Sequence, residues 1–237
     1  MSETIVSCWI CLEQKKLTKE HKFKKNQIRS VYGKQVLFVG NSDEIIAGKK
    51  PRRAQGPNSE AFKFSAPICE RCNGSRTQQA DRAFDHFITV LNRGYHFQNL
   101  EQYFEVEPTT EILKKSGSLD LCRYLAKILG NHAADANYPI SKYLKMFILG
   151  ETDEDRIRFD CTDSNLIPEF HGQSGFLEHG GLIAALDKDS MLPNAYLTSL
   201  NVGVFHFQIR FEFTDEERSD LFVSNPELLR RVRMGVE

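Results

Sequence analysis

The sequence predicts an α+β protein whose N-terminal part is organised around a four-cysteine metal site. Cys8 and Cys11 form one Cys-x-x-Cys pair, and Cys69 and Cys72 form a second. At this spacing two thiolates on one turn can hold a single zinc ion, and two such pairs complete a tetrahedral site. Beyond the second pair, helical and strand-like periods succeed one another, which predicts a C-terminal part of mixed helices and antiparallel strands.

The composition is that of an ordinary globular protein, with 41% hydrophobic and 27% charged residues. No apolar run is long enough to span a bilayer, and the first residues lack the pattern of a signal peptide, so we expect a cytoplasmic protein without a membrane partner. In a reducing compartment the paired cysteines indicate metal ligands rather than disulfides. The isolated Cys122 and Cys161 are expected to be buried apolar residues.

Charge is divided unevenly along the chain. Residues 1–99 contain 17 basic and 9 acidic side chains, whereas residues 100–237 contain 14 and 23. This asymmetry predicts that the N-terminal part contacts nucleic acid, while the acidic part binds a protein partner, dimerises or regulates. The alternative is that the lysine-rich loops serve only solubility. The candidate phosphate contacts are basic side chains of the first part: Lys22, Lys24, Lys25, Arg29, Lys49, Lys50, Arg52, Arg53 and Arg76.

Two domains are expected, over residues 1–98 and 99–237. In the first, residues 4–6 form a short strand, residues 17–23 one arm of a hairpin and residues 61–65 a second strand. A basic insertion at about residues 24–60 contains one strand over residues 35–39 and otherwise loops. Apolar residues recur at three- and four-residue steps between residues 76 and 92, which predicts an amphipathic helix.

In the second domain, helices are expected over residues 119–130 and from Pro139 to residue 148. Strands are expected over residues 157–161, 182–186 and 196–213, the last of which alternates clearly between apolar and polar side chains. A final short helix is expected to start after Pro226.

The cysteine pairs predict a treble-clef site, in which a knuckle, a hairpin and the first turn of a helix surround one zinc ion. Cys72 and Asn73 fall at or just before the N-terminal turn of the predicted helix. Four thiolates leave no open coordination position, so this zinc would be structural and any catalytic metal would lie elsewhere. The alternative is four ordinary buried thiols.

The paired cysteines, the Glu20-His21 dipeptide between them and Cys69-Glu70-Arg71-Cys72-Asn73 leading into a helix resemble one enzyme family. These residues are similar to the HNH (ββα-metal, His-Me finger) endonucleases of the four-cysteine type, over roughly residues 5–92. The resemblance implies hydrolysis of phosphodiester bonds, in DNA more than in RNA, with Mg²⁺ or Mn²⁺ as catalytic metal. It implies His21 as general base and Glu20 and Asn73 as ligands of the catalytic cation.

The resemblance also places this chain near small nucleases of mobile elements, restriction and anti-phage defence, which act beside a partner such as an ATPase. Asp81, two helical turns after Asn73, is a candidate for supporting the cation ligands, although such residues are more often solvated helix positions. Many members of the family carry aspartate where this chain has Glu20. In addition, 57 residues separate Cys11 from Cys69, so the basic insertion must loop out.

The chemistry of the residue types agrees with these roles. Phosphodiester hydrolysis needs a base for water, and histidine titrates near neutral pH. It also needs stabilisation of phosphate charge, which a hard cation held by oxygen ligands supplies. Adjacent residues of a strand point to opposite faces, so Glu20 and His21 share one site only if the strand is bent or bulged there.

Two other readings remain open. The chain can be a treble-clef nucleic-acid-binding module that does not cut, with Glu20-His21 as an ordinary pair. It can also be mainly an interaction scaffold built around the C-terminal part.

Overall fold

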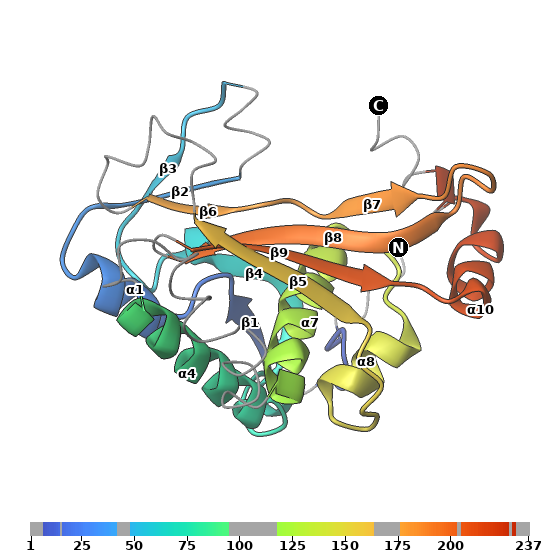
Figure 1. The fold of residues 1–237 in the computed structure, drawn as a ribbon, viewed down its shortest axis with the longest axis horizontal. Helices are drawn as coiled ribbons and strands as arrows, with labels where there is room; N and C mark the ends of the chain where they lie inside the picture. Colours follow the sequence, from blue (N-terminus) through green and yellow to red (C-terminus); the bar gives the residue numbers. More distant parts are fainter. Residues whose placement is uncertain are drawn as a thin grey trace.

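The computed structural model describes residues 7–14, 16–41, 48–94, 118–163, 176–202, 205–227 and 229–230. It contains a two-stranded sheet, a seven-stranded sheet and helices packed against them. Figure 1 shows the long strands of the larger sheet in the upper half of the molecule, with the helices α1, α4, α7 and α8 below them. The predicted α+β class is confirmed.

The N-terminal part contains the predicted hairpin followed by a helix. Strand β1 (Leu17–His21) pairs antiparallel with β4 (Lys63–Cys69), which follows a single 3₁₀ turn, η1 (Glu60–Phe62). A short helix, α3 (Glu70–Asn73), begins directly after β4, and α4 (Gln78–Gly94) follows it. The expected hairpin arm and amphipathic helix are therefore present. The strand expected over residues 4–6 lies outside the described residues.

The basic insertion is more regular than expected. It contains a helix, α1 (Lys25–Tyr32), and two strands, β2 (Leu37–Asn41) and β3 (Arg52–Ala54). The prediction of a single strand missed α1 because its two turns bury few side chains, Gln27 and Ile28 among them, too few to establish a helical period. It also assigned the basic residues of β3 to a loop, because three residues are too short to show alternation.

Strand β2 joins the basic insertion to the C-terminal strands. The larger sheet has the order β3-β2-β6-β8-β9-β5, with β7 also paired to β8. Its C-terminal members are β5 (Ile157–Asp163), β6 (Phe176–His179), β7 (Ile183–Leu186), β8 (Pro193–Val202) and β9 (Phe205–Glu212). The pair β2–β6 is parallel, so the sheet is mixed rather than wholly antiparallel as expected. The long strand expected over residues 196–213 is the hairpin of β8 and β9.

Helix α7 (Ser118–Asp135) is the centre of the core. It packs against α4 and beneath the sheet, and the Tyr124 ring stacks on Phe84 with 4.0 Å between ring centroids. Phe84 also meets the edge of Phe207 on β9. One continuous hydrophobic core therefore contains residues from both sides of the boundary expected near residue 98. That boundary itself lies outside the described residues.

The remaining helices close the C-terminal part. Helix α8 (Lys142–Ile148) begins after Ser141, whose hydroxyl accepts a hydrogen bond from the Leu144 amide. Helix α10 (Asp215–Arg218) starts with a reciprocal capping box between Thr214 and Glu217 and continues into one π-helical turn, η2 (Ser219–Val223). Residues 226, 227, 229 and 230 are also helical, where a final helix was expected. Within the described part of the chain, no helix combines the length and apolar character needed to cross a bilayer.

Candidate metal centre

The four paired cysteines form one cluster. The sulfur atoms of Cys8, Cys11, Cys69 and Cys72 all lie within 4.8 Å of one another. The Sγ atoms of Cys11 and Cys69 are 3.6 Å apart. Zn–S bonds of about 2.3 Å in a tetrahedron place neighbouring sulfurs about 3.8 Å apart, so the cluster has the dimensions of a structural zinc site. The sequence prediction of a four-cysteine cluster is confirmed.

Local hydrogen bonds hold the first cysteine pair in position. The amide of Cys8 donates to the Glu13 carbonyl and the amide of Leu12 donates to the Cys8 carbonyl, both at 2.8 Å, which closes a tight turn. The Trp9 amide donates to the carbonyl of Pro67, so the turn is also fixed to β4. These contacts bring the first pair to the end of β4, where Cys69 and the start of α3 supply the second pair.

The Trp9 side chain ties the same turn to α7. Its indole Nε1 donates to the side-chain oxygen of Asn131 at 2.9 Å. The ring lies directly over Gly130, where a Cβ atom would come within 2.4 Å of it. A glycine is therefore required at this point of α7, and the metal centre is fixed to a helix that begins more than a hundred residues later in the chain.

The thiols of the cluster do not titrate alike. A hydrogen bond from Cys72 lowers the pKa of Cys8, which favours the thiolate at this sulfur. The same contact, together with burial, raises the pKa of Cys72, and burial raises that of Cys11. Zinc requires all four as thiolates, so metal binding here releases protons.

Glu20 points into the protein interior and forms an ion pair there. Its side chain is buried, and its Oε2 atom is 3.4 Å from the ammonium of Lys127 on α7. That ammonium also lies 3.2 Å from Asp81 on α4 and donates to the hydroxyl of Thr77. Burial raises the pKa of Glu20, and the nearby Lys127 opposes this rise. The predicted cation ligand is therefore already neutralised by a lysine.

Further charges extend this arrangement. The ammonium of Lys24 lies 2.9 Å from Asp85 and 3.8 Å from Asp81. We call these five side chains the buried ion cluster, after its two buried members: Glu20 and Lys127, with the partly exposed Lys24, Asp81 and Asp85. Asp81, a candidate support for the catalytic cation, is thus an ion-pair partner of two lysines. Lys24, a candidate phosphate contact, is directed at carboxylates rather than at solvent.

His21 lies on the other side of an irregularity in β1. The register of β1 against β4 shifts between Lys19 and His21, at the place where the resemblance requires a bend. The His21 ring is half-buried, and within the described residues its Nε2 atom makes no hydrogen bond. Burial and the nearby Lys25 and Lys63 ammonium groups lower its pKa to about 4, so the imidazole is neutral at pH 7.

Asn73 is held beside β1. Its side-chain amide donates to the Thr18 hydroxyl at 3.1 Å. Glu20 and Asn73 therefore have different side-chain partners, Lys127 and Thr18. Among the described residues, the four cysteines are the one set of three or more His, Cys, Asp or Glu side chains with the spacing of metal ligands.

The candidate phosphate contacts fall into three groups. Lys24 belongs to the buried ion cluster, and Arg76 forms an ion pair with Glu151 at 2.8 Å. Lys25 and Arg29 are exposed on α1, and Arg53 is exposed on β3. The others, Lys22, Lys49, Lys50 and Arg52, line one small pocket.

The residue that sequence reasoning missed is Lys127. A fully buried lysine is rare, and its residue type alone predicted a solvent-exposed position. Its spacing carried a weak signal, because it follows the core residue Tyr124 by three positions and so shares a face of α7 with it. The acidic partners, on β1 and α4, could not be inferred from that spacing.

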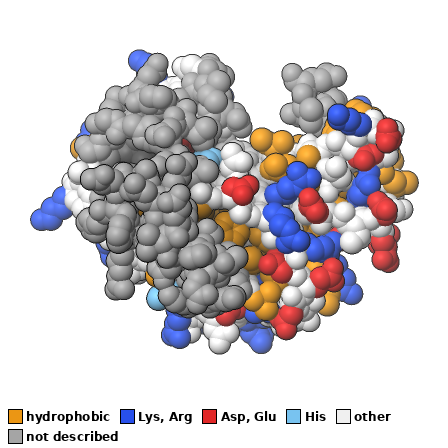
Figure 2. Space-filling model, viewed as in Figure 1, with side chains coloured by type: hydrophobic (Ala, Val, Ile, Leu, Met, Phe, Trp, Pro, Cys, Tyr) orange, Lys and Arg blue, Asp and Glu red, His pale blue; other side chains and the backbone are white. Residues whose placement is uncertain are grey.

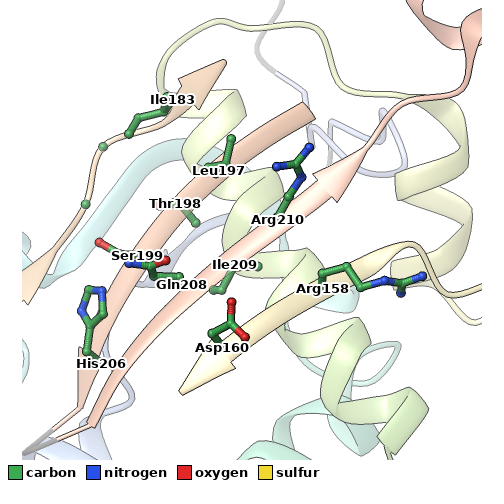
Figure 3. Close-up of a pocket in the computed structure, with 12 residues that line it drawn as sticks. Arg158, Asp160, Ile183, Leu197, Thr198, Ser199, His206, Gln208, Ile209 and Arg210 are labelled. Carbon is green, nitrogen blue, oxygen red and sulfur yellow. The ribbon is translucent and has the colours of Figure 1, made fainter. Parts of the chain in front are cut away.

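A separate open groove lies on the face of the larger sheet opposite the helices. It has a volume of about 400 Å³, and Figure 3 shows Arg158 and Asp160 from β5 beside Gln208 and Arg210 from β9. At one end of the groove, His206 shares a 2.5 Å hydrogen bond with Asn201, whose amide donates to the carboxylate of Glu178. The groove presents both signs of charge, so it has no evident preference for an anion.

Comparison with known proteins adds no family to this description. No protein-family model matches the chain, and no curated protein and no solved structure matches it. The four-cysteine cluster, which has the dimensions of a zinc site, is therefore the feature that indicates metal binding in this part of the molecule.

Proposed function

We propose that this protein is a metal-dependent endonuclease of the HNH type that hydrolyses phosphodiester bonds, in DNA rather than RNA. The observation that carries the proposal is the anchoring of the strand–strand–helix unit to the cysteine cluster. That cluster joins the turn that precedes β1, the end of β4 and the helix that carries Asn73. The acid–histidine pair lies on the same hairpin, at the irregularity in its register.

His21 suits the role of general base. Its lowered pKa keeps the imidazole neutral at physiological pH, and its Nε2 atom makes no hydrogen bond in the described structure. That atom is buried, so the hairpin must open locally before it can contact water. A neutral imidazole can take a proton from water. A phosphodiester bound nearby adds negative charge, which raises the pKa of the ring and makes it a stronger base.

The catalytic cation is the part of the proposal that the described side chains do not prepare. Lys127 already neutralises Glu20, and Asn73 donates to Thr18. Mg²⁺ or Mn²⁺, when bound, would stabilise charge on the phosphate and the leaving oxygen. Its binding through Glu20 requires the carboxylate to leave Lys127, so we expect metal affinity to be low without nucleic acid.

The direct test is a cleavage assay with purified protein, plasmid DNA and Mg²⁺ or Mn²⁺. We expect His21→Ala to lower the cleavage rate by about 10²- to 10⁴-fold, the usual contribution of a general base. His86→Ala is the matched control, because His86 is exposed on α4 and leaves the hairpin intact. Cleavage that is equally fast in His21→Ala would refute the assignment. RNA of the same sequence tests the preference for DNA.

A second candidate is a nucleic-acid-binding module that does not cut. The Glu20–Lys127 ion pair favours it, because a carboxylate paired in the interior is not poised for an external cation. This candidate predicts equal DNA binding by the parent protein and His21→Ala, without cleavage under either metal. Binding and cleavage measured on the same samples separate the two functions.

The acidic C-terminal part is proposed to bind a protein partner, to dimerise or to regulate the nuclease, as in anti-phage defence or mobile-element systems. Its charge is unsuited to direct contact with nucleic acid. On the face of the molecule seen in Figure 2, basic and acidic side chains are interspersed near α8 and α10. A surface of mixed charge is better suited to contact with a protein than with a polyanion. Size-exclusion chromatography with light scattering tests self-association.

A further inference from the structure

A small basic pocket lies where two parallel strands end. It has a volume of about 200 Å³ and lies beside the last residues of β2 and β6. Its polar lining consists of side chains from four separate segments: Lys22, Asn41, Lys49, Lys50, Arg52 and His179. Val39 and Gly40 complete the wall. Among the described residues, no acidic side chain lines it.

Strand pairing explains why these groups converge. Asn41 and His179 occupy paired positions at the carboxyl ends of β2 and β6. Arg52 pairs with Val39 across β2 and β3, so the residues just before β3 also reach this edge. Crevices outside the carboxyl ends of parallel strands are common ligand sites in proteins. Here the basic insertion supplies the charge and a C-terminal strand supplies the floor.

The lysine nearest the floor is fixed in position. The ammonium of Lys22 lies 3.1 Å from Nε2 of His179, and Nδ1 of the same ring lies 3.0 Å from the carbonyl of Gly180. These two contacts indicate a neutral ring whose Nδ1–H donates to the carbonyl and whose Nε2 accepts from the lysine. The ammonium is also 5.7 Å from the centre of the Phe64 ring. One positive charge is thus held rigidly at the base of the pocket.

Size and charge together define the ligand. Among the described residues, four cationic side chains and no carboxylate line the pocket, which favours an anion with several acceptor oxygens. The pocket is smaller than the 300–1,000 Å³ typical of sites for drug-sized ligands, so it suits a single compact group. An arginine and three lysines around one such group match the way proteins bind phosphate.

We propose that this pocket binds one phosphate group, supplied by the end of a nucleic-acid strand, by its internal backbone or by free phosphate. Arg52, Lys49 and Lys50 surround the group, and Lys22 contacts it from the floor. Binding needs none of Glu20, His21 or Asn73. The pocket therefore remains a phosphate site whether or not the protein cuts nucleic acid.

A pair of neighbouring arginines provides the sharpest test. Arg52 and Arg53 are both exposed and consecutive on β3, so their side chains leave opposite faces of the strand, and only Arg52 lines the pocket. Full-length protein is titrated with inorganic phosphate at constant ionic strength by calorimetry. We expect Arg52→Ala to weaken binding about tenfold, as for the loss of a charge-assisted hydrogen bond, and Arg53→Ala to bind like the parent. The double variant Lys49→Ala with Lys50→Ala should bind still more weakly.

Oligonucleotides identify the source of the phosphate. If the ligand is a strand end, a 5′-phosphorylated oligonucleotide binds more tightly than its 5′-hydroxyl form, and Arg52→Ala removes the difference. If it is an internal phosphate, the two forms bind alike, and Arg52→Ala weakens both more than Arg53→Ala does. If only inorganic phosphate shows the Arg52 dependence, free phosphate is the ligand. Equal effects of the two arginine variants in every titration, or no binding at all, would overturn the proposal.

The phosphate-binding measurements do not depend on whether the protein cleaves DNA. His21→Ala should retain phosphate binding, because His21 does not line the pocket. A protein that binds phosphate through Arg52 but never cleaves DNA would leave this site intact and remove only the nuclease proposal.

Discussion

Two clusters of chemically active side chains fix the same hairpin, and they are built in different ways. The four-cysteine cluster assembles from two local Cys-x-x-Cys pairs, one in the turn that precedes β1 and the other at the end of β4 and in α3. The buried ion cluster assembles from β1, α4 and α7, with Lys127 as its central charge. The first can be predicted from spacing along the chain. The second depends on a helix contributed by a distant part of the sequence.

The clusters also differ in what they contribute to stability. A metal bound by four thiolates adds binding energy directly to folding, because the site does not exist in the unfolded chain. Buried ion pairs lose most of their attraction to desolvation, so their net contribution is small until one partner is removed. Removing a cysteine and removing Lys127 should therefore destabilise the protein for different reasons.

The largest effect is expected from the cysteine cluster. Cys69→Ser should abolish stoichiometric zinc binding and lower the melting temperature by about 10 °C or more, because several kcal/mol of metal-binding energy are lost. Metal content by mass spectrometry and thermal melting measure the two effects. Cys161→Ala is the control, since Cys161 lies outside the cluster, and it should keep one zinc per chain. A Cys69→Ser protein that retains its zinc would show that Cys69 is not required for the metal site.

The next effect tests the central charge of the ion cluster. Lys127→Met should cost about 3–5 kcal/mol in the free energy of unfolding at pH 7, because Glu20 and Asp81 lose their shared counter-charge. Urea denaturation measures this cost. Adding Glu20→Gln should restore part of it by removing a buried negative charge. Lys142→Met, at an exposed position on α8, should change stability by less than about 0.5 kcal/mol. Equal losses in the free energy of unfolding for Lys127→Met and Lys142→Met would mean that Lys127 does not stabilise the charges of Glu20 and Asp81.

The smallest effect concerns His21, next to the ion cluster but outside it. Its pKa is about 4 in the folded protein, below the 6.5 of an unperturbed histidine, so the unfolded chain binds more protons between these values. The stability that His21 contributes is therefore complete above pH 6.5 and is lost as the pH falls towards 4. With allowance for partial exposure, this amounts to about 2 kcal/mol.

His21→Gln should remove that dependence. Unfolding measured between pH 7 and pH 4 should show a shallower loss of stability for the variant than for the parent protein. The buried His132 is present in both, so its own titration cancels in the difference. Parallel curves would show that the ring is not protected from protonation.

The nuclease proposal and the comparison of the two clusters both concern Glu20. Family resemblance assigns this side chain to a catalytic cation, whereas the fold pairs it with Lys127. The Nε2 atom of the adjacent His21 makes no hydrogen bond within the described residues but is buried. The two halves of the dipeptide thus have separate environments, which adjacent positions on a regular strand already favour, because successive side chains leave opposite faces.

Sequence patterns determined the elements whose information is local. The cysteine pairs, the apolar period of α4 and α7 and the alternation over β8 and β9 all repeat within one element, so their structures could be predicted. Helix α1 and strand β3 were missed because each is too short to repeat a pattern. No local signal indicated the parallel pairing of β2 with β6, which brings residues far apart in sequence into register.

By itself, then, the sequence determined a four-cysteine cluster, a hairpin followed by a helix and an α+β class, because spacing and period are properties of neighbouring residues. Only the tertiary structure decided that Glu20 meets a buried lysine and that the basic insertion closes a pocket against His179. Both outcomes depend on partners brought together by packing of the whole core. The residues around a charged side chain in the sequence do not indicate which ion-pair partner it will have in the fold.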